Sequence, residues 1–385
     1  MIAVGLMSGT SLDGIDAALV EIRPRGDGYA IDLLDFVTQP FAPDLADALP
    51  AALPPSPGTI AQLATLHREV GMALARAAGA VARERRVDFV ASHGQSIWHD
   101  GGRHISLQIG DAFPIREALR TTVCYDFRTA DTAAGGCGAP LVPYFDAVML
   151  ADADEERVAL NLGGIANFSA LPRGLRRGAD GAFDVLAYDS GPGNMLIDAL
   201  VRRRTDGAQK FDRDGALAAR GRVDAALLEA MLSEPYFTSP SPKSTGRELF
   251  GAQFLERYDL DGLSLEDAAA TVTALTAASV ADAIRGAGLQ RPRVLVSGGG
   301  ARNPTLMGML GQRLAGSCVE STQTMGIDPD AKEAIAFALL GYETLRGRVS
   351  NVPRATGARR AVCLGAVAPH DWSRLMVRIE AECAA

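Results

Sequence analysis

Two segments of the chain share one layout, in which a glycine-rich turn joins two apolar runs. The first segment covers residues 2–22 and turns at 7–14, and the second covers 158–170 and turns at Gly163 and Gly164. Apolar runs on either side of a short turn predict a β-hairpin, because glycine tolerates the backbone angles of a tight turn. We therefore expect two domains, each opened by a glycine hairpin, although residue identity between the two segments is low.

The composition fits this two-domain expectation. The chain has 385 residues, of which 48% are hydrophobic and 22% charged, enough for two sizeable cores. Its formal net charge of −8 argues against nucleic acid or an anionic membrane as the main partner, because phosphate groups attract basic surfaces. We expect no signal peptide, no transmembrane helix and a cytoplasmic location. The five scattered cysteines predict neither a zinc site nor a disulfide framework.

Helical and extended patterns alternate along the chain, which predicts an α/β protein with mixed sheets. Apolar residues at spacings of three and four indicate the helices, and short apolar runs indicate the strands. Asp328 and Pro329 suit the start of the last helix, as its cap and in its first turn. The expected elements are helices over 59–85, 265–287 and 329–346, strands over 87–91 and 293–297, and a polar loop at 92–95.

The glycine turns are the candidate phosphate sites. Lysine occurs only at 210, 243 and 332, never in a G-x-x-x-x-G-K-[ST] loop, so any use of ATP proceeds without that loop. Outward-pointing amides of a glycine turn bind phosphate oxygens, and glycines at a strand end let the backbone approach adenosine. An ordinary hairpin turn is the alternative in each case. The residues assigned to ATP and phosphate are Gly9, Thr10, Ser11, Leu12, Asp13, Gly14, Ile15, Asp16, Asn161, Gly163, Gly164, Asn167, Gly298, Gly299, Gly300 and Asn303.

Two carboxylates have candidate roles in the chemistry. Asp189 follows the apolar run 185–188 and precedes a rigid Gly-Pro-Gly turn, which suits a general base. The alternative is a cap for the helix near Met195, although Ser190 or Asn194 lies nearer to that helix. Asp13 is placed to hold the waters of a Mg²⁺ ion that bridges ATP phosphates.

Polar residues elsewhere are candidates for binding a small-molecule ligand. Three histidines within residues 93–104 lack the spacing of a helical metal site, so a hydrogen bond from a histidine to a ligand is the preferred interpretation. Arg128 and Asp131 either contact a sugar or pair with each other, and Glu333 faces either a cleft or solvent. The residues assigned to the sugar are His93, Gln95, Arg128, Asp131, Asn194 and Glu333.

Ten segments in a fixed order resemble one family, the bacterial anhydro-N-acetylmuramic acid kinases. Together they extend over most of the chain, and ten ordered motifs are far more specific than one. Two positions depart from the pattern, with Ser190 in place of the usual Thr and Cys137 in place of the usual Gln. The segments are 5–16, 92–95, 108–111, 126–128, 138–143, 161–167, 191–194, 244–248, 298–303 and 330–334.

The resemblance implies a two-lobed, duplicated actin/hexokinase-like (ribonuclease H-like) fold with an ATP cleft. The implied lobes are residues 1–130 with about 355–385, and 131–354. It also implies an ATP- and Mg²⁺-dependent enzyme, usually a homodimer, that opens the 1,6-anhydro ring of anhydro-N-acetylmuramic acid and phosphorylates O6. The products would be ADP and N-acetylmuramate 6-phosphate, in peptidoglycan recycling. A kinase of another anhydrosugar such as levoglucosan, and a nucleotide-switched binding protein, remain as alternatives.

Overall fold

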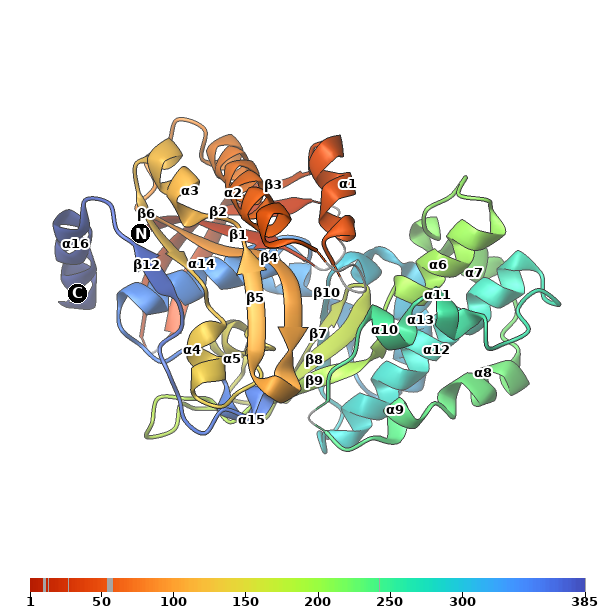
Figure 1. Ribbon diagram of the computed structural model, residues 1–385. Coiled ribbons are helices and arrows are strands. Elements are labelled where there is room, and N and C mark those ends of the chain that lie inside the picture. The colour runs from red at the N-terminus through yellow and green to blue at the C-terminus, as the bar shows by residue number, and fades with distance from the viewer. Residues whose placement is uncertain (10–11, 13, 27, 54–57, 242, 385) are drawn as a thin grey trace. The chain divides into compact units, whose positions relative to one another are not determined.

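The computed structural model describes the whole chain except residues 10–11, 13, 27, 54–57, 242 and 385 (Figure 1). Its contacts divide it into two compact units. Unit 1 comprises Met1–Met149, Arg176–Asp184 and Ala331–Ala385, and unit 2 comprises Leu150–Leu175 and Val185–Asp330. The lobe boundaries expected near residues 130 and 354 stay a prediction, because compact units are defined by packing and lobes by movement.

Unit 1 is built on a seven-stranded sheet with the order β12-β6-β4-β1-β2-β3, in which β5 also pairs with β4. Its strands are β1 (Ile2–Ser8), β2 (Ile15–Arg25), β3 (Gly28–Gln39), β4 (Phe89–Asp100), β5 (Ile105–Ile109), β6 (Thr122–Tyr125) and β12 (Ala366–Ala368). Its helices are α1 (Pro43–Ala51), α2 (Ile60–Ala82), α3 (Ala112–Leu119), α4 (Thr129–Ala133), α5 (Pro143–Leu150), α14 (Lys332–Leu345), α15 (Pro353–Thr356) and α16 (Trp372–Ala384).

Unit 2 is built on a five-stranded sheet with the order β11-β10-β7-β8-β9. Its strands are β7 (Arg157–Leu162), β8 (Ile165–Leu171), β9 (Leu186–Pro192), β10 (Arg293–Ser297) and β11 (Val319–Ser321). Its helices are α6 (Met195–Arg204), α7 (Ala216–Arg220), α8 (Ala225–Leu232), α9 (Pro235–Thr238), α10 (Arg247–Phe250), α11 (Ala252–Leu255), α12 (Leu265–Gly286) and α13 (Pro304–Arg313).

The two sheets repeat one topology, which confirms the predicted duplication. In unit 1, β1 and β2 form an antiparallel hairpin and β3 pairs antiparallel with β2. On the other side of β1, β4 pairs parallel with β1, and β6 pairs parallel with β4. In unit 2, β7, β8 and β9 form the same meander, and β10 and β11 follow β7 in parallel. Both glycine segments are therefore hairpins at the same place in their sheets. The mixed α/β class expected from the sequence is also confirmed.

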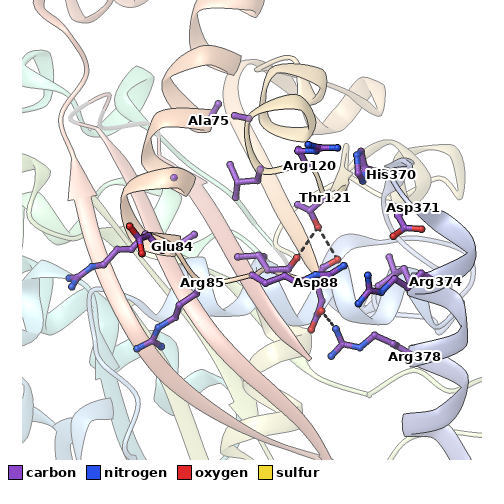
Figure 2. Close-up of a pocket in the computed structure, with 18 residues that line it drawn as sticks. Ala75, Glu84, Arg85, Asp88, Arg120, Thr121, His370, Asp371, Arg374 and Arg378 are labelled. Atoms are coloured by element: carbon purple, nitrogen blue, oxygen red, sulfur yellow. Dashed lines mark hydrogen bonds and ion pairs between the residues drawn. The ribbon is translucent and has the colours of Figure 1, made fainter.

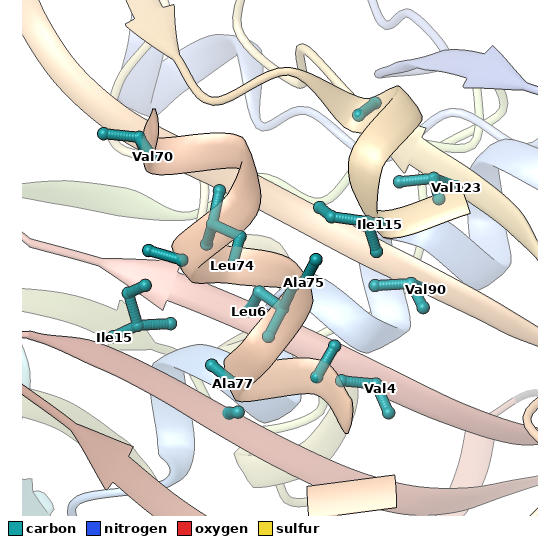
Figure 3. Packing of buried hydrophobic residues seen from close by; sticks show 14 of the residues in the cluster. Val4, Leu6, Ile15, Val70, Leu74, Ala75, Ala77, Val90, Ile115 and Val123 are labelled. Carbon is teal, nitrogen blue, oxygen red and sulfur yellow. The ribbon is translucent and has the colours of Figure 1, made fainter. Parts of the chain in front are cut away.

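The core of unit 1 lies between its sheet and α2 (Figure 3). Thr59 and Gln62 form a capping box that starts α2, and the apolar residues of the helix pack on alternate residues of β1 such as Val4 and Leu6. Gly5 points to the other face, where α14 approaches so closely that a Cβ would lie 1.8 Å from the carbonyl oxygen of Ala334. Glycine is thus required for α14 to lie directly on the sheet.

The core of unit 2 includes α12, which Ser264 caps. Residues 268–281 of this helix are all buried, and most are alanine, threonine or another small residue. Small side chains let a helix pack close to a sheet, and α12 lies against β8 and β9. No helix in the described parts of the chain is both long and apolar enough to cross a membrane.

Three local predictions are wrong. Residues 92–95 are not a loop, because β4 continues to Asp100 and β5 supplies its hydrogen-bonding partner. Asp189 does not end its strand but lies within β9. The helix predicted over 329–346 is α14, which begins at Lys332 with Ala331 as its cap position. Pro329 lies outside it, and its carbonyl accepts a hydrogen bond from the amide of Gly298.

Candidate functional site

The glycine turn of unit 1 is held by two buried side chains. Ser8 Oγ lies 2.9 Å from the carbonyl oxygen of Gly14 and 2.6 Å from Gln95 Oε1. Gln95 Nε2 donates to the carbonyl of Gly9 at 3.1 Å. Gln95 therefore holds the start of the turn and Ser8 holds its end, roles that sequence reasoning missed, and the contact of Gln95 with a sugar stays a prediction. Thr10, Ser11 and Asp13 lie outside the described residues.

Beside this turn, Arg128 binds the ring of His93. Nε and Nη2 of Arg128 lie 3.1 and 3.0 Å from Nε2 of His93, whose Nδ1 lies 3.0 Å from the carbonyl of Gly94. Burial, and then the charge of Arg128, lowers the pKa of His93 to about 3. The imidazole is therefore neutral at physiological pH, donating through Nδ1 and accepting through Nε2. Burial lowers the pKa of Arg128 to about 10, so its guanidinium stays charged.

Glu333, at the start of α14, belongs to the same group of charges. Burial raises the pKa of its carboxyl, Asp16 adds to this, and Lys332 and Arg128 oppose it. Lys332 is not on a solvated face, because it is 2% exposed and its Nζ lies 2.6 Å from a carboxylate oxygen of Asp146. This buried ion pair fixes the first turn of α14, and with it Glu333, near the β1–β2 hairpin.

Asp131 and Arg128 hold the turn at Gly138 from two sides. Asp131 is fully buried, and its Oδ2 accepts from the amide of Gly138 at 2.9 Å. Its Oδ1 accepts from Asn351 Nδ2 and Thr356 Oγ1, each at 2.8 Å. Arg128 Nη1 donates to the carbonyl of Gly138 at 3.3 Å. The two residues thus meet through Gly138, and the geometry of Asp131 favours a positioning role over a direct sugar contact.

In unit 2 the glycine turn is held by backbone groups. The carbonyl of Gly163 accepts from the amide of Asn194, and that of Gly164 accepts from the amides of Gly193 and Met195. Within the described residues, the amides of Gly163 and Gly164 donate to no acceptor. Two free amides on a turn whose carbonyls face the other way suit the oxygens of a phosphate group.

A row of polar residues crosses the sheet of unit 2 next to this turn. Ser297 on β10 pairs with Asn161 on β7, Asn161 pairs with Asn167 on β8, and Asn167 pairs with Asp189 on β9. Directly paired residues have their side chains on the same face of a sheet, roughly 5 Å apart at Cβ. The structure thus brings three of the residues predicted from the sequence into one row and adds Ser297.

Asp189, at the end of this row, is held by the segment that follows α9. The amide of Thr245 donates to Asp189 Oδ2 at 3.0 Å, and Tyr236 donates its hydroxyl proton to the backbone carbonyl of Asp189 at 2.7 Å. Burial raises the pKa of Asp189 to about 6, against the opposing Thr245 hydrogen bond and with a smaller effect of Glu248 in the same direction. A carboxylate with this pKa is ionised at pH 7 and basic enough to accept a proton from water in a transition state.

The remaining predicted residues of unit 2 surround the β7–β8 turn. Asn194 does not cap α6 with its side chain, which instead donates to the carbonyl of Leu162 at 2.9 Å. Gly298 has φ of 77°, and a Cβ there would lie 2.5 Å from Asn161 Oδ1. Asn303 caps α13 by accepting from the amide of Leu306, so its contact with ATP stays a prediction.

The model of the family described as anhydro-N-acetylmuramic acid kinase matches residues 1–370. The chain belongs to this family. Three proteins named anhydro-N-acetylmuramic acid kinase illustrate the similarity. The one from Rhodococcus erythropolis is 44% identical over 377 residues, covering 96% of this chain and 94% of its own. Those from Streptomyces coelicolor and Xanthomonas oryzae are 42% and 44% identical, each over 96% of this chain and 94% and 97% of their own.

Solved structures of other kinases are only distantly similar. A xylulose kinase from Rhodospirillum rubrum has a TM-score of 0.47 and 13% identity, covering 100% of this chain and 98% of its own. A ROK family glucokinase from Streptomyces griseus, in complex with glucose and AMPPNP, has a TM-score of 0.40 and 13% identity, covering 88% and 99%. The assignment therefore rests on the anhydro-N-acetylmuramic acid kinase family itself.

Several residues that support the site of this family member were missed from the sequence. Asp146 pairs with Lys332, and Tyr236 and Thr245 hold Asp189. Nothing in the local sequence around Asp146 or Tyr236 marks these two residues, because each acts on a partner that is distant along the chain. Thr245 lies in the family motif at 244–248, but that motif does not indicate a contact with Asp189.

Proposed function

We propose that the chain is an ATP-dependent kinase that opens the 1,6-anhydro ring of 1,6-anhydro-N-acetylmuramic acid and phosphorylates O6. The products are N-acetylmuramate 6-phosphate and ADP. The observation that carries the proposal is Asp189, a carboxylate with a pKa of about 6 at the end of a polar row beside a turn with free amides. Family membership supports the choice of substrate, and the work of the enzyme would be cytoplasmic recycling of peptidoglycan sugars by a homodimer.

Asp189 acts as the general base in the proposed reaction. It takes a proton from a water molecule while the water oxygen bonds to the anomeric carbon of the sugar. The bond between that carbon and O6 breaks, and its electron pair stays on O6. O6 then bonds to the γ-phosphorus as ADP leaves, so the only proton transferred to the protein is the one on Asp189. The Thr245 amide keeps one carboxylate oxygen oriented throughout.

The glycine turns supply the phosphate contacts. The amides of Gly163 and Gly164 have the direction and freedom that phosphate oxygens need, and they stabilise charge as it moves toward the β-phosphate. Mg²⁺, when bound, would neutralise charge on the ATP phosphates. Its predicted water-mediated ligand, Asp13, lies outside the described residues, and in the described ranges no group of three His, Cys, Asp or Glu side chains is placed to hold a metal.

In unit 1, the cluster around Arg128 has the chemistry to bind a sugar that carries a carboxylate. Arg128 keeps its charge, the neutral ring of His93 keeps it oriented, and Glu333 lies near enough to affect its pKa. Anhydro-N-acetylmuramic acid carries a lactyl carboxylate, which levoglucosan lacks. We therefore propose that the Arg128 cluster favours the N-acetylmuramic sugar, and that Cys137, next to the turn that Arg128 holds, adjusts this preference.

A coupled assay of ADP release tests the proposal. We expect ADP release that depends on anhydro-N-acetylmuramic acid, and little with levoglucosan. Asp189→Asn should lower kcat by about 10²–10⁴-fold while ATP binding is kept, because a positioned base contributes that much. Asp282→Asn, on the exposed side of α12, is the matched control. ATP hydrolysis that is slow and independent of sugar would instead support a nucleotide-switched binding protein.

A further inference from the structure

A cavity of about 550 Å³ lies in unit 1, where α2 and α3 end and α16 passes (Figure 2). Its lining is basic, although the whole chain has a formal net charge of −8. Three carboxylates, Glu84, Asp88 and Asp371, also line it. None of the lining residues is among those predicted to bind ATP or sugar. The arginines that line it are Arg83, Arg85, Arg86, Arg120, Arg374 and Arg378.

Two of the six guanidinium groups are neutralised within the protein. Arg378 forms an ion pair with Asp88, and Arg83 pairs with Asp35 at 2.8 Å. The remaining four form no ion pair with any residue that the structure describes, and only Glu84 and Asp371 stay in the lining to oppose them. The cavity thus keeps an excess of two positive charges. The four unpaired side chains are those of Arg85, Arg86, Arg120 and Arg374.

Helix ends explain part of this cluster but not all of it. Arg83 follows the last residue of α2, and Arg120 follows that of α3, where cations interact well with the terminal carbonyls. Arg374 has no such reason, because it lies in the first turn of α16, at the positive end of that helix. Arg378, one helical turn further along α16, is already paired with Asp88, so Arg374 is the charge of this helix that remains available to an anion.

We propose that this cavity binds a small molecule that carries a phosphate group. Guanidinium groups bind phosphate oxygens in pairs of hydrogen bonds, and the arginines of this lining come from α16 and from the residues that follow α2 and α3. The volume of the cavity suits a phosphorylated sugar or a nucleoside monophosphate as well as free phosphate. Arg374 and Arg378 lie on α16, beyond residue 370 where the family match ends, and the other arginines of the lining lie within that match.

Calorimetric titration of the full chain with inorganic phosphate tests this site. A saturating non-hydrolysable ATP analogue is present, so that the glycine turns are already occupied. We expect one saturable phosphate site that weakens as ionic strength rises. The double variant Arg120→Gln/Arg374→Gln should weaken binding at least tenfold, because it removes charge-assisted hydrogen bonds from two sides of the cavity. Its turnover in the kinase assay should stay near that of the original chain.

Arg68→Gln is the matched control, because Arg68 is an exposed arginine of α2 outside the cavity. If the double variant does not fold, Arg85→Gln/Arg86→Gln removes the charges from another side and should give the same loss. Parallel titrations with glucose 6-phosphate and AMP identify the molecule that carries the phosphate group. Tighter binding of glucose 6-phosphate than of inorganic phosphate indicates a phosphorylated sugar, and tighter binding of AMP indicates a nucleotide. Equal phosphate affinity in the double variant and the original chain, or no saturable binding, would overturn the proposal.

Discussion

The two units repeat one sheet topology but hold their glycine turns in different ways. In unit 1, the side chains of Ser8 and Gln95 fix the turn after β1. In unit 2, the backbone amides of residues 193–195 fix the turn after β7. The shared sheet topology thus specifies where each turn lies, while the hydrogen bonds that hold the turn differ between the two units. Loss of the Gln95 side chain should therefore disturb the turn of unit 1, and a Cβ added at Gly193 should disturb the turn of unit 2.

Among the changes that compare the two units, the largest effect is expected from Gly193→Ala. The added Cβ would lie 2.3 Å from the carbonyl oxygen of Gly163, so the β7–β8 turn must move. Displacement of a phosphate-binding turn by about 1 Å typically lowers kcat/KM on the order of 10²-fold. Steady-state kinetics with varied ATP measures this. Gly286→Ala, at the end of α12 with no atom within 4 Å of its added Cβ, is the control. Equal kinetics in the two variants would contradict the account of this turn.

The next effect is the pH dependence of kcat/KM, which should follow the ionisation of Asp189 in unit 2 and not that of His93 in unit 1. Asp189 has a pKa of about 6, raised from 3.8 by burial, and a base works only when deprotonated. We expect kcat/KM to be constant above pH 7 and to fall about tenfold per pH unit below pH 6. His93 adds nothing in this range, because burial lowers its pKa to about 3. A pH–rate profile that stays flat down to pH 4.5 would show that Asp189 is not the base.

A smaller effect is expected from Gln95→Leu in unit 1. The change removes the hydrogen bond to the carbonyl of Gly9 and leaves Ser8 without the Oε1 atom beside it. The loss of a buried hydrogen bond should lower the free energy of unfolding by about 1–3 kcal/mol. KM for ATP should rise more than kcat falls, because the turn binds phosphate without moving a proton. Chemical denaturation and kinetics measure both, with Gln323→Leu on an exposed turn as the control, and an unchanged KM would argue against this role.

The smallest effect is expected from Thr38→Val on β3. Thr38 donates its hydroxyl proton to Asp16 Oδ1 at 2.6 Å, in the row across the unit 1 sheet that also contains Met7. This row corresponds to the one that ends at Asp189 in unit 2, but it has a threonine on its third strand instead of a base. The hydrogen bond is exposed, so stability should change by less than about 1 kcal/mol and turnover by less than about twofold. A large loss of turnover would mean that unit 1 shares the proton chemistry.

The parts of the fold that depend on local pattern were predictable. The hairpins follow from apolar runs around glycine turns, and α12 follows from a long run of small and apolar residues. The extent of β4 was not predictable, because β5 lengthens it and that pairing is a property of the sheet. The place of Asp189 within β9 was missed for the same reason, since Gly191 and Pro192, which still belong to the strand, resemble a turn together with Gly193 after it.

The residues of the candidate site were likewise predictable where a local motif marks them, and not where their role depends on distant parts of the chain. Residues in family motifs, such as Asp189 and Asn161, were found from the sequence, and the structure places them in one row. Residues that act by supporting others were not found when their partners are far away, as with Lys332 and Asp146. Asp131 was found, but its positioning role was not, because two of its side-chain partners, Asn351 and Thr356, lie more than 200 residues later along the chain.

The small side chains of α12 set how precisely β9, the strand that carries Asp189, is placed. Thr276 donates to the carbonyl of Gly193, and Ser279 lies where a Cβ on Gly191 would be 3.2 Å from its Oγ. The distance between α12 and β9 is therefore set by small side chains. One larger residue on this face of α12 would push β9 away and move the carboxylate of Asp189. The position of Asp189 thus depends on helix residues that were not predicted to bind ATP or sugar.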